Sequence, residues 1–177
     1  MNVNQPIYKY LNYSEEYFNF VINEQDDKSL LNTSYARIFF VFSGELIIDD
    51  NGEILTIGKD EYVFIKAETN VRIIKKNKGN EHFCGAYIGF CKLLLFDFYC
   101  KSGKKLNLCC PQTCCCNIIK LSYNPYIHSL YLSIKVYLEW GRKPSNNIIV
   151  IKQLEGIYCL LLTDDRFQRN LFDFIDS

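Results

Sequence analysis

Cysteine is the most chemically capable residue type in this chain, because nine cysteines occur in 177 residues. Five of them fall within eight residues, in the run Cys109-Cys110-Pro111-Gln112-Thr113-Cys114-Cys115-Cys116. A structural zinc site usually combines two Cys-x-x-Cys pairs that lie far apart in the sequence, and this run has no distant partner pair. Adjacent cysteines in an extended segment also point in opposite directions. We therefore interpret the run as small apolar residues in a strand or loop and predict no metal site; a metal or a redox sensor is the less favoured alternative.

Two histidines are too few for the metal-dependent chemistry of a small barrel enzyme. His82 and His128 fall in different predicted elements, and no His-x-His pair exists. The sequence contains no nucleophile elbow of the Gly-x-Ser-x-Gly type, no phosphate-binding P-loop and no Gly-x-Gly-x-x-Gly fingerprint. We expect no catalytic residues, no cofactor and no enzymatic activity.

The remaining charged groups fit ordinary structural roles. Adjacent carboxylates such as Glu15-Glu16, Asp49-Asp50 and Asp164-Asp165 fall in predicted turns or at helix ends, where they are usually solvated or capping. The basic run Lys75-Lys76-Asn77-Lys78 lies at a predicted hairpin tip. We interpret this run as a solvated turn, with anion binding as the alternative.

Residues 36–65 contain the most regular pattern of strands and turns. Asn51-Gly52 is the strongest hairpin signal, because both central residues of a type I′ turn need a positive φ. Ala36–Ser43 is so apolar that its two faces cannot be distinguished, which indicates a strand covered on both sides. This rhythm predicts a small antiparallel barrel or sandwich. The predicted strands are Ala36–Ser43, Glu45–Asp49, Glu53–Ile57 and Tyr62–Ile65.

The pattern predicts roughly eight strands. Residues 1–34 read as a lead-in that contains one strand around residues 17–22 and a polar turn at residues 24–28. Beyond the central hairpins, strands are predicted at Val71–Lys75, His82–Phe90 and Leu93–Tyr99. Residues 101–117 break the rhythm and are interpreted as a linker or an irregular edge.

From Pro125 onward the spacing of apolar residues becomes helical. Asn124 is the expected N-cap of a first helix, which Gly141 ends. A second helix is predicted after Ser145 or Asn146, and a short third helix covers Arg166–Ile175. We therefore divide the chain into a barrel with its lead-in, residues 1–117, and a helical subdomain, residues 118–177.

Two sets of apolar residues are candidate sites. Small barrels either fill with side chains or keep a cavity for one ligand, and the sequence leaves both open, with a filled barrel preferred. The candidate pocket residues are Phe40, Phe42, Tyr62, Phe64 and Tyr87. The candidate dimer residues on the first helix are Leu130, Ile134 and Leu138, and the alternative is that this stripe packs on the barrel or on the second helix.

The composition excludes several classes of protein. With 49% hydrophobic residues the chain is not disordered. Twenty basic residues balance twenty acidic ones, which argues against a nucleic-acid-binding surface on this chain itself. No secretory leader is visible in residues 1–20, and no apolar run is long enough to span a membrane. We expect a cytoplasmic protein with reduced thiols.

The order of these signals resembles the N-terminal cupin-like regulatory domain of AraC-type transcription factors. The residues that carry the resemblance are Arg37–Glu45, Gly58-Lys59-Asp60-Glu61 and the helical segment from Pro125. Lys152, Glu155 and Leu160-Leu161-Leu162 are similar to a pattern in that family's second helix. The resemblance covers about residues 35–175.

The resemblance implies an α+β, mostly β fold: a cupin-like antiparallel β-barrel, or double-stranded β-helix, followed by two to three C-terminal helices. It implies a homodimeric sensing domain that controls an attached DNA-binding domain in response to a small molecule or a protein partner. The helix-turn-helix motifs of that family are not in this chain, so DNA contact is expected only through another domain. The alternatives are a stand-alone protein-interaction module without a small ligand and, less favoured, a metal-dependent cupin enzyme such as an isomerase or dioxygenase.

Overall fold

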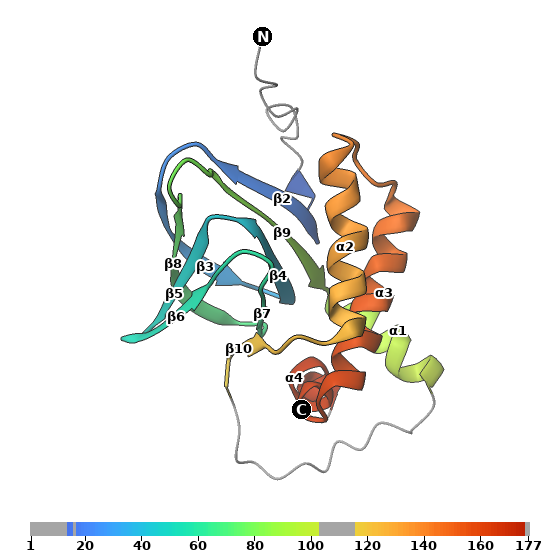
Figure 1. Ribbon diagram of the computed structural model, residues 1–177. Coiled ribbons are helices and arrows are strands. Elements are labelled where there is room, and N and C mark those ends of the chain that lie inside the picture. Colours follow the sequence, from blue (N-terminus) through green and yellow to red (C-terminus); the bar gives the residue numbers. More distant parts are fainter. Residues whose placement is uncertain (1–13, 16, 103–115, 176–177) are drawn as a thin grey trace.

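The computed structural model describes residues 14–15, 17–102 and 116–175. Two antiparallel sheets face each other and helices cover the outer side of the first sheet (Figure 1). The first sheet holds, in spatial order, β1 (Ser14–Glu15), β2 (Phe18–Asn23), β9 (Phe83–Phe90), β4 (Ala36–Ser43), β7 (Tyr62–Ile65) and β10 (Ile118–Leu121). The second sheet holds β3 (Asp27–Thr33), β8 (Thr69–Lys76), β5 (Glu45–Asp50) and β6 (Glu53–Ile57). The predicted mostly β, cupin-like architecture is confirmed.

The first sheet separates two hydrophobic cores. Side chains alternate between the faces of a strand, so Phe39 and Val41 enter the core between the sheets, whereas Ile38 and Phe40 enter the core under the helices. All residues of β4 from Ala36 to Phe42 are buried for this reason. The prediction that this strand is covered on both sides is confirmed.

The tight turns follow the predicted chemistry. Asn51 and Gly52 have φ values of 54° and 99°, as a type I′ turn requires, and the Gly52 N–H donates to Asp49 Oδ1 at 2.8 Å. Gly44 has a φ of 73° between β4 and β5, a conformation that costs glycine little. Asn51-Gly52 thus closes the β5–β6 hairpin of the second sheet, and Gly44 lets the chain pass from the first sheet to the second.

The C-terminal helices begin where the sequence predicted. The N-cap of α2 (Pro125–Glu139) is Asn124, whose side chain accepts from the Tyr126 N–H at 2.8 Å. The N-cap of α3 (Asn146–Thr163) is Ser145. The third helical segment consists of α4 (Arg166–Phe172) and a 3-10 turn, η2 (Asp173–Ile175). No helix among the described residues combines the length and apolar character that a membrane crossing requires.

Two predictions about elements are wrong, and one strand near the helices was missed. Residues predicted as a strand at Leu93–Tyr99 form α1 (Lys92–Ser102), because a short apolar run does not distinguish a strand from a buried helix. The predicted polar turn at residues 24–28 runs into β3, and β10 was not predicted at all. The division at residue 117 stays a prediction, although β10, which follows it, pairs with β7 of the barrel. The predicted linker and most of the cysteine run lie outside the described residues.

Candidate functional site: a cavity between the sheets and α2

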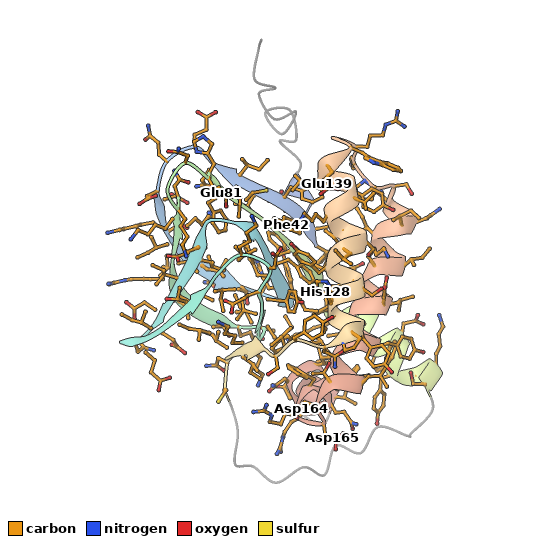
Figure 2. All side chains as sticks on the ribbon, viewed as in Figure 1. Phe42, Glu81, His128, Glu139, Asp164 and Asp165 are labelled. Atoms are coloured by element: carbon orange, nitrogen blue, oxygen red, sulfur yellow. The ribbon has the colours of Figure 1, made fainter. Side chains whose placement is uncertain are left out.

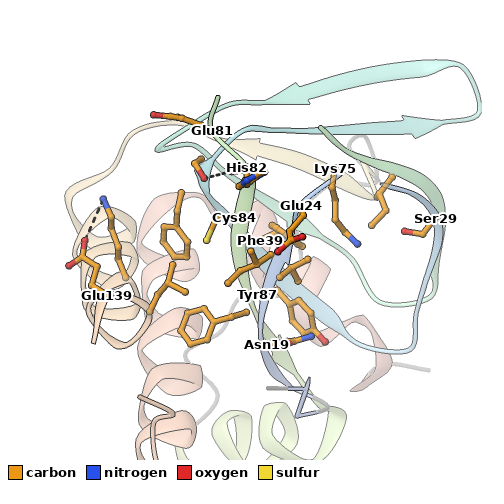
Figure 3. A pocket seen from close by; sticks show the side chains of 18 of the residues that line it. Asn19, Glu24, Ser29, Phe39, Lys75, Glu81, His82, Cys84, Tyr87 and Glu139 are labelled. Atoms are coloured by element: carbon orange, nitrogen blue, oxygen red, sulfur yellow. Dashed lines mark hydrogen bonds and ion pairs between the residues drawn. The ribbon is translucent and has the colours of Figure 1, made fainter. Parts of the chain in front are cut away.

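A cavity of about 1260 Å³ opens between the two sheets and extends to α2. Its wall between the sheets includes Phe39 and Tyr87, which Figure 3 shows facing Ser29 and Lys75 of the second sheet. On the helix side the wall includes Phe42, Cys84, Lys135, Leu138 and Glu139. The cavity is therefore in contact with both hydrophobic cores, which makes it the part of the molecule best placed to receive a ligand.

Strand register explains which side chains reach the cavity. Phe39 of β4 lies opposite Tyr87 of β9, and Tyr87 lies opposite Asn19 of β2. Gly85 leaves room for this arrangement, because a Cβ there would lie 2.7 Å from the Phe39 ring. Three neighbouring strands thus present one ring, one ring with a hydroxyl, and one amide to the same space.

Arg37 is the one buried arginine of the described residues, with 6% of its surface exposed, and it lines the cavity. Its guanidinium carbon lies 4.6 Å from the ring centroids of both Tyr35 and Tyr87. Its Nε has no hydrogen-bond partner, and no ion pair joins it to a carboxylate of the described residues. Burial lowers the pKa of Arg37 from its ordinary value, but arginine keeps its charge in proteins.

The other cation between the sheets is already balanced. Lys75 Nζ lies 2.9 Å from Asp27 Oδ2, and 15% of the Lys75 side chain is exposed. The hydrogen bond from Lys75 and its charge lower the pKa of Asp27. At the helix side, Lys135 Nζ lies 3.9 Å from Glu139 Oε1. Arg37 is therefore the cation of the cavity wall that lacks a carboxylate partner within the described residues.

A cluster of hydroxyl and imidazole groups joins the barrel to α2. Tyr62 Oη and His128 Nδ1 are hydrogen-bonded at 2.9 Å, and the Tyr131 hydroxyl donates to Asp60. The rings of His128 and Tyr131 stack with centroids 5.5 Å apart. Burial is the main cause that raises the pKa of Tyr62 and of Tyr131 above the ordinary value, and the Asp60 carboxylate adds to it. Figure 2 shows His128 between the first sheet and α2, with Glu139 at the other end of that helix.

The structure divides the predicted pocket residues between two places. Phe42 and Tyr87 line the cavity. Phe40, Tyr62 and Phe64 belong to the core under the helices instead, where Phe64 packs edge-to-face on Phe167 at 5.1 Å. Strand alternation sends the even-numbered residues of β4 and β7 to the helix side. Phe42 also belongs to that core, but it lines the cavity where the cavity extends to α2.

The predicted dimer residues lie inside the chain's own core. Leu130 and Ile134 are fully buried, and Leu138 is 3% exposed and lines the cavity. The stripe thus packs on the barrel, which was the alternative for these residues. The homodimer itself stays a prediction, and the outer faces of the helices are one surface that remains available for it. Large apolar residues exposed there are Leu132 and Val136 of α2, Trp140 at its C-cap, and Val150, Ile151, Tyr158 and Leu162 of α3.

The remaining candidate groups are potential metal ligands and thiols. No group of three or more potential metal ligands occurs within the part of the chain that the structure describes. Burial raises the pKa of the Cys84 thiol to about 12 and that of Cys159 to about 11, which suppresses the reactive thiolate. The backbone carbonyl of His82 accepts a hydrogen bond from Ser43 at 2.6 Å.

Sequence reasoning missed Arg37, Asn19 and Ser29 as cavity residues. A usable signal existed for Arg37, since it is the only charged residue of β4 and its neighbours from Ala36 to Phe42 are all apolar. A charge in a strand buried on both faces must point either into a cavity or toward a partner. Asn19 and Ser29 carry no comparable signal, because their strands are half polar.

Comparisons with known proteins match most of the chain. The sequence model of the ExsA N-terminal regulatory domain matches residues 36–170. The chain is similar to an apo ToxT variant from Vibrio cholerae, with a TM-score of 0.59 and 11% identity over 88% of this chain and 57% of that chain. A second ToxT structure from Vibrio cholerae gives a TM-score of 0.53 and 11% identity over 86% of this chain and 58% of that chain. At these identities the ToxT matches show the fold alone.

Two further comparisons concern a smaller cupin domain and the curated protein sequences. A cupin domain of an XRE-family transcriptional regulator from Enterobacter cloacae matches 42% of this chain and 81% of that chain at 18% identity, with a TM-score of 0.35. No curated protein sequence matches the chain. The chain spans somewhat more than half the length of the ToxT chains that it matches.

Proposed function

Because the chain belongs to the ExsA N-terminal regulatory domain family and is a cupin-like regulatory domain of the AraC type, we propose that it senses a ligand in the cavity and transmits the signal through α2 and α3. The response is a change in how an attached DNA-binding domain is positioned within a homodimer. The effector is a small molecule or a protein partner, and the site of action is the cytoplasm. The family is a regulatory one, and no enzymatic activity is proposed.

The observation that carries this proposal is that one cavity is walled by both the barrel interior and α2. An occupant that contacts Tyr87 on one side and Leu138 on the other has different contacts when α2 shifts relative to the barrel. A ligand changes a conformational equilibrium only through such differential contacts. The hydrogen-bonded cluster of Tyr62, His128, Tyr131 and Asp60 holds α2 to the barrel, so a displacement of the helix would strain it.

A cavity-filling substitution tests this coupling without knowledge of the effector. Ser29→Trp places a large ring in the cavity from β3, and we expect altered amide hydrogen exchange in the C-terminal half of α2, around residues 133–139. Ser122→Trp, at an exposed position before α2, is the matched control and should leave that exchange unchanged. Both variants should keep the wild-type circular dichroism. Unchanged exchange in α2 of a folded Ser29→Trp protein would refute coupling between cavity and helix.

The outer faces of α2 and α3 support a homodimer. Leu132 and Val136 are 48% and 37% exposed, and Ile151, Tyr158 and Leu162 on the neighbouring helix are between 53% and 62% exposed. The two helices lie side by side on the sheet (Figure 1), and large apolar residues gathered on a surface are typical of protein interfaces. A second copy of the chain would cover them.

Light scattering after size exclusion tests the dimer. We expect the wild-type chain to elute as a dimer and Ile151→Asp to elute as a monomer, because an aspartate in an apolar interface is costly to desolvate. Ile54→Asp on β6, a residue 71% exposed, is the control and should remain dimeric. A monomeric wild type, or a dimer that survives Ile151→Asp, would favour the second candidate, an interaction module for a different protein at the same helix faces.

A further inference from the structure

We propose that the cavity is a site for a monocarboxylate ligand and that Arg37 is the residue that binds its carboxylate. The inference rests on the cavity being a ligand site, as proposed above, and adds the chemical class of the ligand.

The first argument is the unbalanced charge of Arg37. A buried cation without a partner is strongly unfavourable, yet Arg37 is 94% buried and lacks a carboxylate partner among the described residues. Cation–π contacts with Tyr35 and Tyr87 offset part of this cost, but they leave Nε without a hydrogen-bond acceptor. An anion in the cavity would supply both the missing charge and the missing acceptor.

The second argument is the direction from which an anion can approach. The two tyrosine rings lie close to the guanidinium carbon, each at 4.6 Å, and their positions over it restrict approach from its faces. The edge of the guanidinium carries its N–H donors in one plane. A carboxylate is planar and accepts two parallel hydrogen bonds from such an edge.

The third argument selects a single negative charge on an apolar body. The other cations of the wall, Lys75 and Lys135, already have the carboxylate partners Asp27 and Glu139. The carboxylates of Glu24 and Glu81 also line the cavity, so the cavity would repel a phosphate dianion more strongly than a monocarboxylate. Beyond Arg37 the wall between the sheets includes Phe39, Tyr87, Leu31 and Ile73, which suit an aromatic or aliphatic remainder, and Asn19 and Ser29 offer additional hydrogen bonds.

Gly89 is the backbone feature that makes this arrangement possible. It lies directly opposite Arg37 in the sheet, and a Cβ at this position would overlap the ring of Tyr35. Glycine therefore lets Tyr35 lie against the strand beside the guanidinium. An aromatic ring held in this way restricts Arg37 to one orientation, which is what a preorganised binding group requires.

A thermal-shift series on the whole chain tests the inference. The probes are 3-phenylpropionate and its neutral amide, which share their shape and differ in charge. We expect the carboxylate to raise the Tm of the wild type by about 3–5 °C at ten times its Kd, and the amide to raise it by less than about 1 °C. Arg37→Met should lose the carboxylate response, whereas Arg72→Met, at an exposed position of β8, should keep it.

The Tm without any probe separates a binding role from a structural one. If Arg37 is retained for a ligand, Arg37→Met removes an unpaired buried charge, so its Tm should equal or exceed that of the wild type. If Arg37→Met fails to fold, Arg37→Lys replaces it and should give a reduced response, because lysine cannot donate two parallel hydrogen bonds.

Several results would overturn the carboxylate site. An equal response to the amide would leave the cavity as a ligand site and remove the role of charge. A carboxylate response that persists in Arg37→Met would place the ligand elsewhere. No response of the wild type to the carboxylate, or a folded Arg37→Met with a lower Tm, would show a structural arginine. The coupling of cavity and α2 is judged separately by Ser29→Trp.

Discussion

Leu93 and Leu95 offer a direct test of how α1 packs, because two identical side chains two residues apart have opposite environments. Leu93 is 83% exposed and Leu95 is 3% exposed. In a strand, residues i and i+2 share a face, so truncation of either leucine would cost the same. In a helix the two positions are about 200° apart. We therefore expect Leu95→Ala to destabilise the protein strongly and Leu93→Ala to have almost no effect.

The magnitude follows from the burial of Leu95. A buried Leu→Ala substitution costs about 2–5 kcal/mol of unfolding free energy, through lost transfer energy and the cavity left behind. Leu95 belongs to the core under the helices, together with Phe98, whose ring lies 6.1 Å from Phe172 and 4.9 Å from Tyr158. The cost should therefore include looser packing of α1 on α3 and α4. Leu93→Ala should stay within about 0.5 kcal/mol, since alanine also favours the helix slightly.

Urea denaturation followed by far-ultraviolet circular dichroism measures both variants. With a urea m-value of about 1–3 kcal/mol/M, Leu95→Ala should lower the midpoint by roughly 1–2 M, while Leu93→Ala should reproduce the wild-type curve. Equal losses in the two variants would refute the helical packing of this segment. A larger loss in Leu93→Ala would mean that the exposed face of α1 is covered in solution.

Three further predictions concern other parts of the fold. Gly44→Ala should lower the free energy of unfolding by about 1–3 kcal/mol, because the φ of Gly44 is 73° and a Cβ there would lie 2.6 Å from the Lys76 carbonyl oxygen. Urea denaturation measures this loss, and an unchanged midpoint would contradict the expected strain. Burial alone would raise the pKa of Glu61, but hydrogen bonds from Lys120 and the Gly58 N–H and the Lys120 charge lower it below the ordinary 4.5. Glu61 therefore stabilises the fold above pH 4.5, and this stability is lost as the pH falls through its folded pKa. The Tm of the wild type should fall between pH 7 and pH 3 in part for this reason, and Lys120→Met should make that fall smaller. An identical dependence of Tm on pH in the two proteins would argue against the pair. Burial raises the pKa of Cys84 to about 12, so Cys84 should resist iodoacetamide in the native protein at pH 8, while the exposed Cys100 should react. Mass spectrometry measures the labelling of each cysteine, and equal labelling would contradict the burial of Cys84.

The sequence was sufficient for elements whose signals are local. The Asn51-Gly52 turn, the Asn124 cap and the doubly covered strand Ala36–Ser43 depend on the residues themselves and their immediate neighbours, and all three are confirmed. β3 was not predicted because most of its residues are polar, and β10 was not predicted because it has only four residues. They become strands through pairing with β8 and β7, which are distant in the sequence.

The candidate site was harder to predict because it depends on which face of a strand a residue occupies. Five aromatic residues were expected to share one pocket, yet only Phe42 and Tyr87 line the cavity. In a strand that is apolar on both faces, the sequence does not show which residues point toward the cavity and which point toward the helices. The cavity also needs β3, which was not predicted, and contact with α2, which no local pattern specifies. The one informative residue was Arg37, since a charge within such a strand requires an explanation.

The first sheet lies between the two hydrophobic cores, and this position limits how the sequence of its central strand can vary. Each residue change in β4 alters the packing on one side of the first sheet, while the backbone shift that accommodates it is felt on the other side. A neutral exchange in this strand must therefore satisfy barrel and helices together, and compensating changes are needed on both sides of the sheet. Residues on β2 and β3 that line the cavity carry fewer such constraints, so the lining of the cavity can vary there while the central strand stays fixed.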